Sequence, residues 1–194
     1  MLFVWIVISS FVSGGAYSVC APMLPPELEK KDITGLLVGI IFAMYSVGSI
    51  LWAPVVGKYL INKVGAKNLL GLSIGVMGWL FIMFGQIEVI ESRRNVTILA
   101  SVIRFAQGIA GTTHWTTCLS LVSTIATPEK KEKMLGINTG IWGLGMLAGP
   151  LIGSALYSLL GFKIMCFFYG CVQMLLAIFI RVGLLEKKSH IQES

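Results

Sequence analysis

Six long apolar runs separated by short polar breaks constrain this chain more than any other feature. Each is close to or above the roughly 20 residues that a helix needs to cross about 30 Å of hydrocarbon. With 56% hydrophobic residues and a mean hydropathy of +0.84, the chain has more apolar surface than a globule of 194 residues could bury. The sequence therefore predicts an all-α integral membrane protein whose six transmembrane helices lie at about 2–23, 33–56, 69–87, 98–126, 134–160 and 164–183.

The polar breaks are too short to hold a soluble domain, so residues 1–185 are expected to form one bundle, followed by a tail at 186–194. Nine of the 15 basic residues fall on the side that holds both termini, five fall on the other side, and Arg104 lies inside a run. Since basic residues concentrate on the cytosolic side, both termini and the tail are expected in the cytosol. The net charge of +6 thus reflects topology and does not indicate a nucleic-acid partner.

Catalytic and metal-binding patterns are weak in this sequence. The four cysteines lie in or beside apolar runs without CxxC spacing, which favours packing over metal binding or disulfides. A GxSxG pattern at residues 71–75 lies within an apolar run, whereas a nucleophile elbow needs a strand-to-helix turn. We expect no enzyme, no metal site and no cofactor.

Polar residues at depth favour a solute path. Arg104 lies in the fourth run, where a charge near the bilayer centre costs roughly 2.5 to 3.5 kcal/mol and usually faces a cavity or the bundle interior. His114 lies deeper and is open to two interpretations, a packing residue or a proton relay. We expect Tyr45, His114, Asn138 and Trp142 to line one substrate cavity.

The fifth run is rich in glycine. Gly145, Gly149 and Gly153 recur every four residues, which places them on one helix face where another backbone can approach closely. Pro150 loosens the local hydrogen bonding. This pattern predicts tight helix packing, which a transporter and a non-transporting scaffold could both use.

Two of these stretches resemble signatures of the major facilitator superfamily, in its drug:proton antiporter branch. "RFAQGIAG" is similar to the motif RxxQGxGxA, and the resemblance implies a role in proton coupling for Arg104, with Gln107 and Gly108 beside it. "GMLAGPLIGS" resembles GxxxGPxxGG, which the family ties to exchange.

The loop after the second run resembles the cytosolic gate GxxxDRxGRR of the same family. The matching positions are Asn62, Lys63, Gly65 and Lys67, with Asn62 where an aspartate is usual. The wider stretch from Ala21 to Leu70 looks most like the vesicular amine and polyamine transporters. Vesicular monoamine carriers carry an acid in the first helix that pairs with the amine, but here Ser13 lies near that position.

The resemblance implies one six-helix half of a 12-helix transporter that exchanges protons for an organic cation, amine or drug-like compound by alternating access. Its expected partners are a small-molecule substrate, protons, the lipid bilayer, and a missing C-terminal half or a second copy of the chain. With one half in 194 residues, the chain is expected to be a fragment, a truncated product or a dimerising half-transporter. The alternative is a non-transporting membrane scaffold or an inactive remnant.

Overall fold

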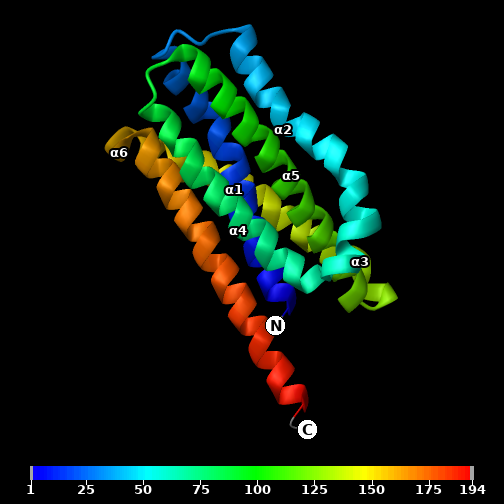
Figure 1. The fold of residues 1–194 in the computed structure, drawn as a ribbon. Coiled ribbons are helices and arrows are strands. Elements are labelled where there is room, and N and C mark those ends of the chain that lie inside the picture. Colours follow the sequence, from blue (N-terminus) through cyan, green and yellow to red (C-terminus); the bar gives the residue numbers. More distant parts are fainter. Residues whose placement is uncertain (1, 193–194) are drawn as a thin grey trace.

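The computed structural model describes the backbone of residues 2–192 and the side chains as far as Gly183. Figure 1 shows a bundle of long helices that run side by side. No strand occurs in the described range, so the all-α prediction is confirmed. The elements are α1 (Leu2–Glu29), α2 (Leu36–Val55), a π-helical turn η1 (Val56–Leu60), α3 (Ile61–Val64), α4 (Ala66–Gly85), a 3-10 turn η2 (Gln86–Glu88), α5 (Arg93–Ile125) and α6 (Pro128–Gln192).

Five of the described helices are long and apolar enough to cross a membrane, where the sequence predicted six crossings. The apolar part of α6, Pro128–Gly183, has 56 residues and would be about 84 Å long if straight, far more than a bilayer spans. Gly161 interrupts it with a φ of 84°, which glycine adopts without a steric penalty. The chain reverses direction there, so α6 holds both the fifth and the sixth crossing (Figure 1).

The predicted tail at 186–194 falls partly outside the described residues. The backbone of α6 remains helical as far as Gln192, whereas residues 193–194 and all side chains of the tail are not described. Both ends of the chain lie at the same end of the bundle in Figure 1. This end is called the terminal end below, and the other the far end.

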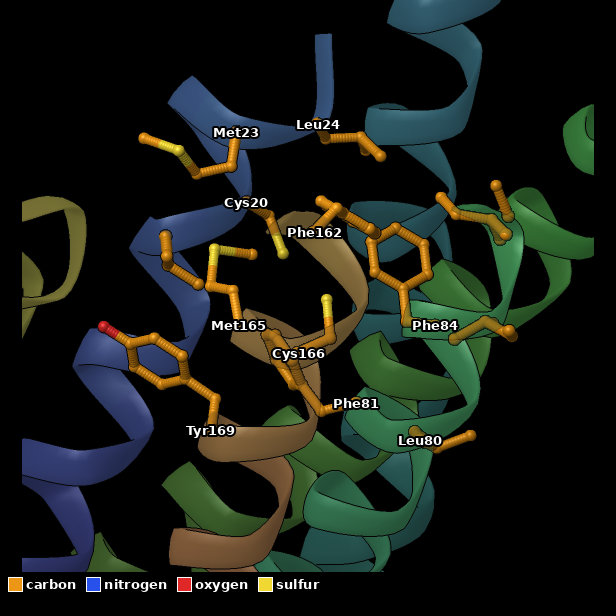
Figure 2. Close-up of a cluster of buried hydrophobic side chains, with 14 of the residues drawn as sticks. Cys20, Met23, Leu24, Leu80, Phe81, Phe84, Phe162, Met165, Cys166 and Tyr169 are labelled. Atoms are coloured by element: carbon orange, nitrogen blue, oxygen red, sulfur yellow. The ribbon is translucent and has the colours of Figure 1, made fainter. Parts of the chain in front are cut away.

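Hydrophobic packing holds the bundle together in two clusters. Figure 2 shows the larger one, towards the far end, where α1, α4 and α6 converge. Phe84 and Phe162 meet there with ring centroids 5.8 Å apart, and Phe81 and Tyr169 meet at 6.2 Å. The smaller cluster, around the fully buried Ile6 and Ile180, closes the terminal end.

Glycines allow α1 and the first part of α6 to approach each other closely. In α6, a side chain at Gly145 would meet the carbonyl of Phe11, and one at Gly149 would meet the carbonyl of Gly15. The predicted glycine face therefore packs directly on the backbone of α1. Gly153 continues it and lies against Val19. Pro150, beside this face, is partly buried.

Polar contacts fasten the loops at the far end. Lys30 donates a hydrogen bond of 2.7 Å to the buried Glu27, and this bond raises the pKa of Lys30 above its ordinary value. Lys31 donates to two backbone carbonyls, those of Glu88 and Ile90. The backbone N–H of Lys163 donates to the Glu88 carboxylate, which caps the helix that follows Gly161. Three loops are thereby tied together at the far end.

Candidate functional site

A pocket of about 390 Å³ lies between four helices, near the middle of each one. An aromatic ring from each helix borders it: one from α1, one from α2, one from α5 and one from the first part of α6. These are Tyr17, Tyr45, Trp115 and Trp142. The remaining lining residues are Ser13, Gly111, Thr112 and His114.

The four aromatic rings form a connected set, called the aromatic box below. Tyr17 lies edge-on to Tyr45 with centroids 5.1 Å apart, and Trp142 lies 6.0 Å from Tyr17 and 5.4 Å from Trp115. No aspartate or glutamate is among the lining residues. Aromatic faces carry a negative potential, which can attract a cation.

Tyr45 owes its position to two glycines of α5. A side chain at Gly108 would meet the backbone carbonyl of Tyr45, and one at Gly111 would meet its hydroxyl group. The absence of side chains at both positions therefore lets α2 approach α5 and seats the Tyr45 ring over this face. A further contact, from Trp52 Nε1 to Thr113 Oγ1 at 3.0 Å, also links the two helices.

Arg104 lies beside the pocket rather than in its lining, on the far-end side of Gly108. Its side chain is only 4% exposed, and its guanidinium lies 5.1 Å from the Tyr45 ring centroid and 5.3 Å from that of Phe42. Arg104 Nη1 donates a hydrogen bond of 3.1 Å to Gln107 Oε1, while Arg104 Nε and Gln107 Nε2 have no partner among the described residues. Tyr45 thus separates a buried positive charge from the pocket.

His114 borders the pocket and belongs to a buried polar cluster behind it. Its Nε2 lies 3.6 Å from the sulfur of Cys118, and the Ser10 hydroxyl lies 3.8 Å from the same sulfur. Ser10 also donates a hydrogen bond of 2.8 Å to Asn138 Oδ1. Asn138 is fully buried and lies outside the pocket lining, so three of the four residues expected in the cavity meet there: Tyr45, His114 and Trp142.

The residues of the expected gate loop lie away from the pocket, at the terminal end. Asn62 and Lys63 are exposed in α3, and Lys67 is exposed in the first turn of α4. Gly65 joins the two helices with a φ of 84°. Asn62 Nδ2 donates to the Lys58 carbonyl at 3.2 Å, a local contact within the loop.

Sequence reasoning missed two walls of the aromatic box, Tyr17 and Trp115. Both lie in apolar runs, where an aromatic ring is equally typical of the protein core and of the surface that faces lipid. The available signal was the position of each residue along its predicted span: Tyr17 lies in the second half of the first span, and Trp115 directly follows His114.

Comparison with known proteins adds independent information. The sequence profile described as "Major Facilitator Superfamily" matches residues 6–193. The chain is 30% identical to the mouse protein named "MFS-type transporter SLC18B1" over 92% of its own length and 38% of that protein, and 28% identical to the human protein of this name over 82% and 35%. It is 24% identical to "Tetracycline resistance protein, class H" of Pasteurella multocida over 70% and 32%. The chain thus spans about a third of the length of these relatives.

Proposed function

This chain belongs to the major facilitator superfamily, and on that premise we propose that it forms one half of a transporter that moves a small organic solute across a membrane by alternating access. The aromatic box carries this proposal, because it joins four different helices around a pocket near their midpoints. Substrate sites of such transporters lie at mid-membrane between two halves. The substrate is accordingly held between this pocket and a second half.

The substrate is an organic cation, an amine or a drug-like compound. Four aromatic side chains without a carboxylate in the lining suit a weakly hydrated cation, which loses little hydration free energy on leaving water. The names of two relatives, a tetracycline resistance protein and an "Efflux pump DEP3", are consistent with drug-like substrates. Ser13 lines the pocket near the position of the amine-pairing acid of vesicular monoamine carriers, so in this proposal the second half supplies any carboxylate.

Proton coupling rests on Arg104. A buried cation that lacks a carboxylate partner among the described residues makes its surroundings unfavourable for further positive charge. A bound organic cation and a proton bound in the same pocket would repel each other as well as Arg104, so the two bind in alternation, as exchange requires. His114 is the lining residue whose type titrates nearest to neutral pH.

The second half is either a C-terminal half of the same transporter or a second copy of this chain. The share of the relatives that the chain covers favours the first. During the cycle the close contact of α1 with Gly145, Gly149 and Gly153 acts as a rigid pivot, because backbones packed without side chains between them have little room to shift.

Both termini face the cytosol in this proposal. They lie at one end of the bundle, and that end carries the expected gate loop with Lys63 and Lys67 (Figure 1). Basic residues at a membrane boundary favour the cytosolic side. Asn62 and Lys63 of the gate loop then contact the second half when the transporter is closed to the cytosol.

Substitution of Trp142 tests the pocket. In the transporter assembled with its second half, Trp142→Leu is expected to weaken equilibrium binding of radiolabelled tetraphenylphosphonium by about tenfold, since it removes a desolvated cation–π face. Trp79→Leu is the matched control, because Trp79 is 54% exposed on α4 and distant from the aromatic box. Equal affinity of both variants would contradict a pocket for cations and would favour a scaffold.

A further inference from the structure

An apolar groove of about 320 Å³ runs along the outside of the bundle between α4 and the last part of α6. Its floor lies where the two helices touch, since a Cβ at Gly75 would lie 3.2 Å from the Cβ of Ala177. Large apolar side chains form its walls, all of them partly exposed or exposed. They are Leu72, Val76 and Trp79 on α4, and Met174 and Ile178 on α6.

One end of the groove is basic. Arg181 is the charged residue among its lining, and its Cγ lies 3.5 Å from the position of a Cβ on Gly71. Lys67 lies one helical turn before Gly71, on the same face of α4, and is exposed. Two positive charges therefore mark the terminal end of an otherwise apolar surface.

The length of the groove fits one leaflet of a bilayer. Gly71 and Trp79 are eight residues apart, which corresponds to about 12 Å along a helix. Half of the hydrocarbon core is about 15 Å thick. A chain of methylenes could thus follow the groove from the basic end towards the bilayer centre.

The groove and the aromatic box use different surfaces. The box involves α1, α2, α5 and the first part of α6, whereas the groove involves α4 and the last part of α6. A second half that covers the box therefore need not cover the groove, which is then open to lipid.

We propose that this groove binds an acyl chain of an anionic phospholipid whose phosphate contacts Arg181 and Lys67. The apolar walls match the chain, and the two cations match the headgroup. Basic pockets between transmembrane helices bind anionic headgroups in this way.

Trp79 provides the readout. The chain is reconstituted into phosphatidylcholine vesicles that contain a small fraction of brominated phosphatidylserine or brominated phosphatidylcholine, whose bromine atoms quench nearby tryptophan. The Trp79 signal is obtained as the difference from Trp79→Phe. Brominated phosphatidylserine is expected to quench it with about fivefold preference over brominated phosphatidylcholine.

The variants separate a site from general attraction to the membrane. Arg181→Gln is expected to remove most of the preference and Arg181→Lys to retain it, whereas Lys133→Gln, which changes an exposed cation outside the groove, should leave it intact. Equal quenching by both lipids, or a preference that survives Arg181→Gln combined with Lys67→Gln, would overturn the proposal. No quenching by either lipid would show that another protein segment covers the groove and would overturn it as well.

Discussion

Replacing Gly149 with leucine is expected to destabilise the bundle by about 3 kcal/mol, at the upper end of the range for overpacking. The new side chain would overlap the Gly15 carbonyl and the Ser18 hydroxyl, and backbone cannot move aside as a flexible side chain can. It would also disturb the Gly149 carbonyl, which accepts a 2.7 Å hydrogen bond from the Tyr169 hydroxyl. The thermal unfolding midpoint of the purified protein in mild detergent measures this effect.

Gly143→Leu is the matched control for this prediction. Gly143 lies in the same helix, less than two turns away, but a Cβ there has nothing within 4 Å. The midpoint of this variant is expected to stay close to that of the parent protein. A similar loss in both variants would mean that the apolar helix tolerates no leucine in this stretch, and the close contact with α1 would not be the cause.

Replacing Arg104 with alanine is expected to reduce proton-driven uptake by at least about 30-fold in the complete transporter. At an effective dielectric constant near 20, two positive unit charges about 8 Å apart repel each other by on the order of 2 kcal/mol, and a cation on the pocket side of Tyr45 experiences a repulsion of this order from Arg104. That energy corresponds to roughly 30-fold in affinity. Without this repulsion, a proton in the pocket is held roughly 30-fold more tightly and is no longer released in exchange for substrate, so the proton gradient ceases to drive uptake.

Two readouts distinguish lost coupling from a damaged fold. Uptake driven by a pH gradient should fall, whereas exchange of labelled for unlabelled substrate without a gradient should persist, because the aromatic box remains. Arg104→Lys retains the charge and should keep part of the driven uptake, although it loses the planar contact with Phe42 and Tyr45. Normal driven uptake by Arg104→Ala would show that the arginine does not couple the fluxes.

Much of the fold could be predicted because hydrophobic length alone determines how many times a chain can cross a bilayer. The break between the fifth and sixth runs is only "GFK", and the structure confirms a reversal there, at Gly161. What the sequence could not show is that the two helices meet directly at the kink, where Gly161 is the residue with non-helical backbone angles. Boundaries of this kind depend on tertiary contacts, such as the Glu88 carboxylate that caps the second segment.

The candidate site was only partly predictable. Polar residues in an apolar run are conspicuous, which is why Arg104 and His114 stood out. Aromatic residues are common in apolar runs, so the sequence does not distinguish Tyr17 from a packing residue. Its place in the pocket follows from the packing of α1, which puts its ring centroid 5.1 Å from that of Tyr45. For Asn138 the prediction was wrong in the other direction. This polar residue was expected in the pocket lining, but it is fully buried behind the pocket, where its Oδ1 accepts a hydrogen bond from Ser10.

Access of water to the aromatic box from alternating sides tests the central claim most directly. The reporter is Thr112→Cys, which lies in the pocket lining, in a background where Cys20, Cys118, Cys166 and Cys171 are replaced by alanine. In the complete transporter, a membrane-impermeant thiol reagent is expected to label this cysteine from one side or the other according to the direction of the pH gradient, and a bound organic cation should protect it. Absence of labelling from both sides, or labelling that neither the gradient nor the cation changes, would contradict alternating access around this pocket.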